Sequence, residues 1–217
     1  MRGGKPPLER AIRLMGAAAL LAAASFLLPA ASEAAPKLFG TVEFRMPPRN
    51  GDGWASVLKR NASHPVFAQA ESFLSRSTTW GKLRSHLEGK PFMEKLDAVN
   101  RFWNASPYRS DREAYGKDDY WAAPYEFVSR SGDCEDYCIV KYFTLKALGV
   151  SVDSMRIVVV RETIRGIGHA VLAVYEGENI WILDNLADNV RSSRRIRNYI
   201  PQYSLNEKKR WSHVRPH

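Results

Sequence analysis

Apolar residues recur at helical spacing in the first half of the chain and form strand-like runs in the second half. Four of them follow one another at three- and four-residue steps: Phe92, Leu96, Val99 and Trp103. Because Pro91 suits a first helical position, they predict a helix over residues 91–104. Weaker patterns predict helices over residues 65–75 and 80–87. Residues 105–130 have no clean period and are rich in Tyr and Trp, so they either wall a groove or pack over the core.

A further helix is predicted after residue 133. Its buried stripe consists of Ile139, Tyr142, Leu145 and Leu148. Asp133 suits the N-cap and Gly149 the end of this helix, so Cys134 takes its first position. Runs rich in Val and Ile then predict strands over residues 155–161, 169–175 and 180–186.

The last two strands are expected to form a hairpin whose register can be worked out. A turn centred on Gly177 and Glu178 pairs residues whose numbers sum to 355, so Val171 lies opposite Asp184. His169 is two residues from Val171 and therefore on the same face. His169 and Asp184 become diagonal neighbours with backbones ~7–8 Å apart, within reach of each other's side chains. A slip of one residue would separate them.

Helical patterns come first along the chain, and a strand and an antiparallel hairpin follow them. Pro and Gly are frequent in residues 36–53, so we expect an irregular arm there. We interpret residues 35–217 as a single domain, long enough to bury a sizeable core.

The segment 1–34 has the organisation of a secretory signal peptide. Four basic residues precede an apolar run that extends from Leu14 to Leu28, and Ser32-Glu33-Ala34 offers the small residues that a signal peptidase reads. The run is shorter than the ~20 residues of a membrane-spanning helix, and an uncleaved anchor is the alternative. We expect cleavage after Ala34 and export to the periplasm.

The net charge is basic but does not point to nucleic acid. The whole chain carries +9, and the segment 1–34 holds four basic and two acidic side chains, which leaves +7 for the remainder. The basic residues are scattered, with loose clusters only at 191–197 and 208–210. We therefore favour a solvated basic surface and expect no nucleic-acid partner.

Cys134, His169 and Asp184 occur in the order of a nucleophile, its base and the group that orients the base. A cysteine at a helix start becomes a thiolate more readily because of the helix dipole and a nearby imidazole. Of the five histidines, only His169 opens a strand after a glycine-bracketed turn, with a carboxylate expected on the next strand. These residues predict the triad of a cysteine hydrolase.

Cys138 lies one helical turn after Cys134. In an oxidising compartment the two could form a disulfide that acts as a redox switch, but a bridge across so small a loop would stabilise little. We expect Cys138 to be a small buried helix residue. A zinc site made of Cys134, Cys138 and His169 is a further alternative, although it lacks a fourth ligand.

Three carboxylates surround the predicted nucleophile: Asp133, Glu135 and Asp136. Their charge would raise the pKa of the Cys134 thiol and favour its neutral form. They either cap the helix, where acids suit the dipole, or bind a hard cation such as Ca²⁺ through their oxygens. The spacing is not that of an EF-hand.

The stretches Gly132-Asp133-Cys134-Glu135-Asp136-Tyr137, Gly168-His169-Ala170-Val171-Leu172 and Leu183-Asp184-Asn185 together resemble the bacterial transglutaminase-like cysteine proteinases, whose best-understood members are the LapG-type periplasmic proteases. The resemblance runs from about residue 99 to 203. It implies an α+β fold with a papain-like/transglutaminase-like core, in which helices pack on an antiparallel sheet. It also implies Cys134 as nucleophile, His169 as base and Asp184 as the orienting group. It also implies Ca²⁺ held by Asp133, Glu135 and Asp136.

The resemblance further implies a biological setting. LapG-type proteases cut a large surface adhesin and release cells from a biofilm, and an inner-membrane cyclic-di-GMP receptor inhibits them. We therefore expect a protein substrate, such as an adhesin, and a receptor of this kind as a partner. Two alternatives remain: an acyl transferase or deamidase with the same triad, and an exported binding module without catalysis.

Overall fold

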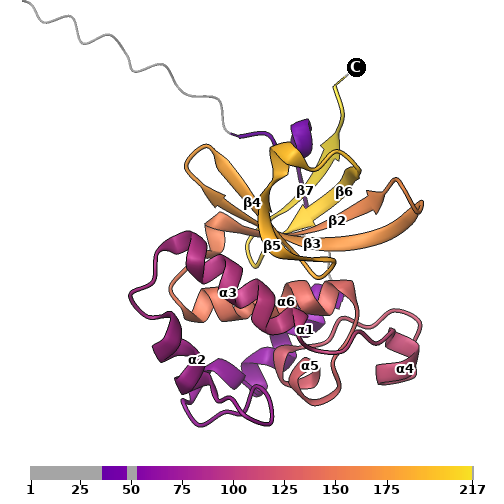
Figure 1. Cartoon of the computed structure of the whole chain (residues 1–217). Helices are drawn as coiled ribbons and strands as arrows, with labels where there is room; N and C mark the ends of the chain where they lie inside the picture. Colours follow the sequence, from indigo (N-terminus) through magenta and orange to yellow (C-terminus); the bar gives the residue numbers. More distant parts are fainter. Residues whose placement is uncertain (1–35, 48–52, 217) are drawn as a thin grey trace, which may run out of the picture. The chain divides into compact units, whose positions relative to one another are not determined.

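In the computed structural model, a seven-stranded sheet is covered on one face by a layer of helices (Figure 1). The structure describes residues 36–47 and 53–216, so the predicted signal peptide lies outside it. The helices of these described parts are α1 (Gly53–Ser63), α2 (Trp80–Leu87), α3 (Phe92–Asn104), α4 (Asp111–Tyr115), α5 (Pro124–Arg130) and α6 (Cys134–Ala147), with short 3-10 turns η1 (Leu38–Gly40), η2 (Val66–Ala68), η3 (Val152–Ser154) and η4 (Ser193–Arg195). The strands are β1 (Val42–Met46), β2 (Met155–Glu162), β3 (Ile167–Glu176), β4 (Asn179–Asp184), β5 (Ala187–Ser192), β6 (Tyr199–Leu205) and β7 (Arg210–Val214).

The sheet has the order β1-β7-β6-β2-β3-β4-β5, and every neighbouring pair is antiparallel. Within the β3–β4 hairpin, Leu172 pairs with Leu183 and Glu176 pairs with Asn179. Both pairs have the predicted sum, so the expected register is confirmed. The expected arrangement of helices on an antiparallel sheet is confirmed as well.

Two apolar clusters lie on opposite faces of the sheet. The larger one fills the space between the sheet and the helices, where Leu172 of β3 packs with residues of α3 and α6. Trp103 of α3 is fully buried there, and its indole N–H donates a 2.9 Å hydrogen bond to Thr144 of α6. The smaller cluster includes Val171 and Ile182 and is closed by Leu38 of η1. Both faces of the central strands are therefore buried, as their continuous Val and Ile runs require.

The structure corrects two expectations in the N-terminal half. Residues 65–75 do not form a helix beyond η2, because the chain turns back and Phe73 pairs with Thr79 in an isolated bridge. Residues 36–53 are not a wholly irregular arm, since they contain η1 and β1. Strand β1 is an edge strand that pairs with β7 from the far end of the chain. The predicted helices over residues 80–87, 91–104 and 134–148 are confirmed within a residue or two at each end.

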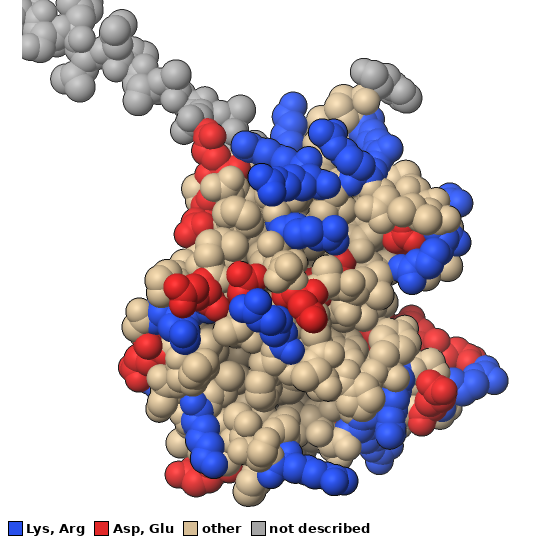
Figure 2. Space-filling view, viewed as in Figure 1, with Lys and Arg blue, Asp and Glu red and all other residues tan. Residues whose placement is uncertain are grey.

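Charged side chains are mixed over the face drawn in Figure 2, where Lys and Arg are densest above the sheet and Asp and Glu lie between them. Mixed signs of this kind are typical of a solvated surface. Among residues 36–47 and 53–216, no helix has the length and apolar character needed to cross a membrane.

The contact between α3 and α6 leads to a stability prediction. Replacing Trp103 by Ala should lower the free energy of unfolding by about 3–5 kcal/mol, because it leaves a cavity and removes the donor to the buried Thr144 hydroxyl. Urea unfolding followed by circular dichroism measures this change. Phe73→Ala is the control, since Phe73 is 68% exposed, and it should stay within about 0.5 kcal/mol of wild type. Equal losses in both variants would contradict the assignment of Trp103 to the core.

Candidate active site

His169 and Asp184 meet inside the protein through a hydrogen bond. The Nε2–H of His169 donates to Asp184 Oδ1 at 2.9 Å, and both side chains are 5% exposed or less. His169 is near the start of β3 and Asp184 is the last residue of β4, so the hairpin register brings them together. Because Nε2 is occupied, Nδ1 is the nitrogen left for a nucleophile, and no hydrogen bond among the described residues engages it.

Other groups complete the surroundings of the Asp184 carboxylate. The hydroxyl of Tyr199 donates to Oδ2 at 2.6 Å, and the backbone N–H of Leu186 donates to Oδ1 at 2.9 Å. Burial raises the pKa of Asp184, but the hydrogen bonds and charge of His169 and the Tyr199 hydroxyl outweigh it and hold the pKa below its ordinary value. Asp184 is therefore an anion at neutral pH, as a residue that orients an imidazole should be. The sequence had not indicated Tyr199.

Cys134 takes the first position of α6 with Asp133 as N-cap, as predicted. Its Sγ donates a 3.2 Å hydrogen bond to the carboxylate of Glu135, and no hydrogen bond joins it to His169 among the described residues. Burial raises the pKa of the Cys134 thiol, and the charges of Glu135 and Asp133 raise it further. The expected lowering of the pKa by helix dipole and imidazole is therefore not seen, because burial and, after it, the neighbouring carboxylates raise the pKa instead.

Residues 131–133, which we call the nucleophile loop, hold a strained backbone. Ser131 has φ 64° and ψ −163°, a region that essentially only glycine adopts, at a cost of about 1–3 kcal/mol. Three hydrogen bonds keep it there: its N–H donates to Phe127 O, its hydroxyl to Pro107 O, and Tyr115 donates to its carbonyl at 2.6 Å. The direction in which the chain enters α6 is thus set by contacts from three segments.

Gly132 is required for a different reason. A Cβ atom at this position would lie 2.0 Å from Asp136 Oδ2, which is far inside van der Waals contact. Asp136 is fully buried and cannot move aside freely, because Oδ1 accepts from Ala122 N at 2.6 Å and Oδ2 accepts from Asp133 N at 3.3 Å. The Gly-Asp-Cys sequence is therefore a packing requirement of the buried carboxylate.

Five carboxylates gather around the start of α6 and form what we call the acidic cluster: Asp111, Asp119, Asp133, Glu135 and Asp136. Asp111, Asp133 and Asp136 can bring one oxygen each within 4.8 Å of one another, and Asp111, Asp119 and Glu135 can do the same. The sequence had indicated only the three members next to Cys134. Asp111 and Asp119 come from an earlier segment of the chain and join the cluster through the fold.

The acidic cluster fits a hard cation. Asp111 Oδ1 and Asp133 Oδ1 are buried and have no hydrogen-bond partner, although each could accept one. Burial together with neighbouring carboxylates raises the pKa of Asp133 to about 9 and of Asp136 to about 8. Unpaired carboxylate oxygens at close range are the ligands that Ca²⁺ prefers.

The two cysteines are separate free thiols. Cys138 is buried inside α6, as expected of a small helix residue. Burial raises the pKa of its thiol well above the ordinary value, which keeps it protonated and inert.

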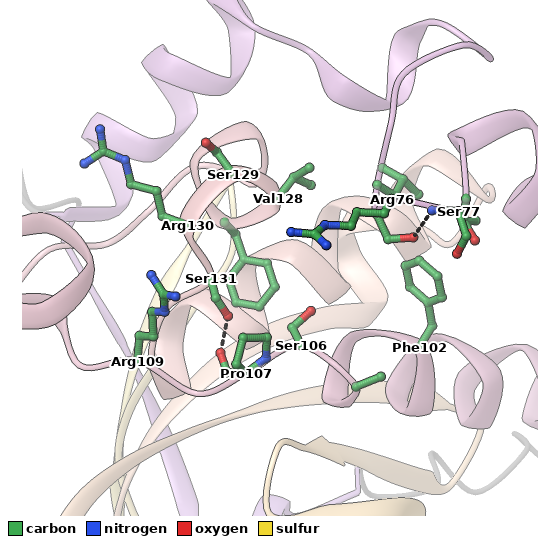
Figure 3. Close-up of a pocket in the computed structure, with 15 residues that line it drawn as sticks. Arg76, Ser77, Phe102, Ser106, Pro107, Arg109, Val128, Ser129, Arg130 and Ser131 are labelled. Carbon is green, nitrogen blue, oxygen red and sulfur yellow. Dashed lines mark hydrogen bonds between the residues drawn. The ribbon is translucent and has the colours of Figure 1, made fainter.

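The hollow drawn in Figure 3 adjoins the nucleophile loop. It has a volume of about 510 Å³, and Ser131 forms part of its wall. Cys134, His169 and Asp184 do not line it. Tyr108 is 59% exposed next to the nucleophile loop, where it pairs with Gly132, whereas Tyr115 and Trp121 from the same aromatic segment are half-buried. That segment therefore mostly packs against the protein.

The fit at Gly132 gives a prediction. Gly132→Ala should destabilise the protein by about 1–3 kcal/mol, because the new Cβ displaces Asp136 from its backbone donors. Urea unfolding measures the loss. Gly168→Ala is a matched control, since no atom lies within 4 Å of a Cβ built there, and it should be neutral or slightly stabilising. A neutral Gly132→Ala would show that Asp136 is not held as described.

A second prediction concerns pH. Asp184 has a lowered pKa in the folded protein, so it contributes stability above its unfolded pKa of about 3.8 and loses it as the pH falls through the folded pKa. Tyr199→Phe removes a donor to the anion, so it should cost about 1.5–3 kcal/mol at pH 7 and less at pH 3. Urea unfolding at both pH values tests this. In Tyr175→Phe, which removes a hydroxyl bonded to Glu43, the titration of Asp184 followed by NMR should not move.

The chain is similar to known proteins over most of its length. The sequence profile of the bacterial transglutaminase-like cysteine proteinases matches residues 61–217. A solved structure of Legionella pneumophila LapG in a calcium-bound form is 33% identical, covers 73% of this chain and 86% of its own, and superposes with a TM-score of 0.58. An EGTA-treated form has the same identity and TM-score and is covered over 84% of its length. Curated protein sequences give no match. The chain therefore belongs to the bacterial transglutaminase-like cysteine proteinase family, with its α+β transglutaminase-like fold and cysteine peptidase activity.

Proposed function

We propose that the protein is an exported cysteine endopeptidase whose triad is Cys134, His169 and Asp184. The observation that carries this proposal is the buried 2.9 Å hydrogen bond from His169 Nε2 to Asp184. It fixes the imidazole tautomer and leaves Nδ1 as a base. Cys134 at the first position of α6 is the matching nucleophile.

In this mechanism, His169 Nδ1 removes the thiol proton and the Cys134 sulfur attacks the carbonyl carbon of the scissile peptide. The backbone N–H of Cys134, at the start of α6, donates to the oxyanion that forms. The imidazolium then returns its proton to the leaving amine as the peptide C–N bond breaks. Water attacks the remaining thioester with His169 again as base, which releases the acid product and restores the thiol.

We propose that Ca²⁺ supports this activity through the acidic cluster. Asp133, Glu135 and Asp136, joined by Asp111, would hold it with their carboxylate oxygens. The ion would supply positive charge beside the nucleophile, which favours the thiolate. Glu135 is also the hydrogen-bond partner of Cys134 Sγ, so its engagement elsewhere would free the thiol for His169. Solved forms of the LapG relative are described as calcium-bound and EGTA-treated.

The biological setting is also a proposal. We propose that the segment 1–34 directs export to the periplasm, that the substrate is a surface adhesin whose cleavage controls biofilm attachment, and that an inner-membrane cyclic-di-GMP receptor inhibits the enzyme. The support is membership of the family that contains LapG.

Alkylation of the mature protein by an iodoacetamide probe tests the triad. With Ca²⁺ present, Cys134 should react rapidly below pH 7 because its thiolate pairs with the His169 imidazolium, and His169→Ala should abolish this acidic limb. Cys134→Ala locates the label, and Cys138→Ala should leave the rate unchanged because Cys138 is buried. The triad would be refuted if the alkylation rate had the pH dependence of an ordinary thiol and did not change in His169→Ala.

Thermal unfolding tests the calcium site without an activity assay. Adding Ca²⁺ at about 100 times its dissociation constant should stabilise the protein by about 2.7 kcal/mol, and chelator should reverse the gain. Asp111→Asn and Asp133→Asn should each weaken it. Asp153→Asn, an exposed aspartate that pairs with Lys208, is the control and should keep the full calcium effect. A melting temperature that does not change when Ca²⁺ is added would contradict the calcium site.

A further inference from the structure

A buried lysine links the helix of the nucleophile to the turn that carries Asp184. Lys141 is two turns after Cys134 on α6 and is completely buried. Its ammonium donates to Asn100 Oδ1 at 2.8 Å and to Asn104 Oδ1 at 2.7 Å, both on α3. Burial lowers the pKa of Lys141 to about 8, so the protein keeps a cation here at an energetic cost.

The same two asparagines also form hydrogen bonds with residues 184–188, which we call the acid turn. Asn104 Nδ2 donates to the carbonyl of Asp184 at 3.0 Å and to that of Ala187 at 3.2 Å. Asn100 Nδ2 donates to the carbonyl of Ala187 at 2.7 Å and to that of Asp188 at 2.9 Å. The acid turn joins β4 to the edge strand β5, so α3 is its main support from the helical layer.

The chemistry of lysine sets the direction of these bonds. An ammonium can only donate, so it requires both asparagine oxygens to face Lys141. The amide N–H groups must then face the acid turn, where backbone carbonyls accept their hydrogen bonds. Without the cation, either amide could turn over and present its oxygen to those carbonyls, which would repel it.

We propose that Lys141 is a positioning residue, which fixes the acid turn through Asn100 and Asn104 and thereby holds Asp184 in place for His169. The proposal rests on the proposed triad. The positive charge of Lys141 also lies near the buried Asp184 anion, whose negative charge raises the lysine pKa against the larger effect of burial. Neither asparagine nor Lys141 touches the reacting atoms, so all three act through Asp184.

The proposal is tested with Lys141→Met, which keeps length and removes the donors, and with Asn104→Leu, which removes the bonds of that asparagine to the acid turn. Lys146→Met is the matched control, because Lys146 is on the same helix but pairs with Glu207 at the surface. Two readouts are needed beside urea unfolding: the NMR signal of the His169 Nε2 proton and the His169-dependent alkylation rate of Cys134.

In both test variants the His169 Nε2 proton should exchange faster and lose its hydrogen-bonded shift, and alkylation below pH 7 should slow about tenfold, while Lys146→Met matches wild type. A stability loss with an unchanged proton signal and rate would overturn the proposal and leave a purely structural role. If Lys141→Met does not fold, Asn104→Leu decides alone. Failure of the triad itself would be recognised separately, because Cys134 would then be alkylated at the same rate in the wild-type protein and in His169→Ala.

A second and independent feature is the basic character of the hollow in Figure 3, which we call the arginine pocket. Arg76, Arg109 and Arg130 line it, together with six Ser or Thr residues and no acidic residue. Neither Arg76 nor Arg109 forms an ion pair through its guanidinium among the described residues, and Arg130 makes only a 3.4 Å hydrogen bond to Ala114 O. Arg109 is near enough to Glu113 to lower the pKa of that carboxyl, but not close enough for an ion pair. Guanidinium groups that form no ion pair in a hollow are suited to carboxylates.

We infer that the arginine pocket binds an acidic segment of a protein substrate, outside the bond that is cut. This inference rests on the proposed function. The pocket shares Ser131 with the nucleophile loop, so a bound segment would lie close to the chain entering Cys134. Its volume of about 510 Å³ accommodates a few residues rather than a folded partner.

Fluorescence anisotropy with a labelled hexaglutamate peptide tests this on the Cys134→Ala protein, so the result does not depend on catalysis. The double variant Arg76→Gln and Arg109→Gln should weaken binding at least tenfold. The matched double variant Lys208→Gln and Lys209→Gln removes the same charge at the β6–β7 turn and should change it less than twofold. Equal losses in both, or equally strong displacement by inorganic phosphate, would overturn the inference in favour of general charge attraction or a small-anion site.

Discussion

Burial of the Asp184 carboxylate is the constraint on which the rest of the site depends. An anion that is almost fully removed from water is tolerated only if its oxygens are paired, and each partner comes from a different part of the chain. His169 is supplied by the neighbouring strand β3 and Tyr199 by β6. The backbone of the acid turn adds Leu186 N–H, and α3 holds that turn through its asparagines. The sheet register, the edge hairpin and the helical layer must all be correct for this one carboxylate to be satisfied.

The start of α6 presents the opposite situation, because its carboxylates are gathered without enough partners. Three of them lie within reach of one another, and two have buried oxygens with no donor. Such a cluster opposes formation of a thiolate at Cys134, which a cysteine peptidase needs. A bound cation resolves both difficulties at once, since it pairs the oxygens and reverses the local charge. The proposed calcium dependence thus follows from electrostatics within the site.

The nucleophile loop is also held in place by contacts from several segments of the chain. Ser131 adopts a strained backbone, and hydrogen bonds from three segments hold it there. A residue larger than glycine at position 132 would collide with the buried Asp136 carboxylate. Strain of this kind persists only where the surroundings over-determine it, and such positions cluster at functional sites. Cys134 is therefore held by contacts close to it in the fold, whereas Asp184 is held by a network of distant segments. Lys141 joins the two regions, because it is on the helix of Cys134 and binds the asparagines of α3 that support the acid turn.

Much of this could be predicted from the sequence, because the relevant signals are local. The helix start at Cys134 depends on the adjacent Asp133, and the meeting of His169 with Asp184 depends on one tight turn whose register follows from counting residues. Tertiary structure alone decided the rest. Strand β1 pairs with β7 from the opposite end of the chain, and Asp111 and Tyr199 reach the site from segments with no local pattern to mark them. Lys141 is on the predicted helix, but its contacts with Asn100 and Asn104 of α3 depend on how the two helices pack. Their roles depend on which distant groups share a buried volume, and spacing along the chain carries no information about that.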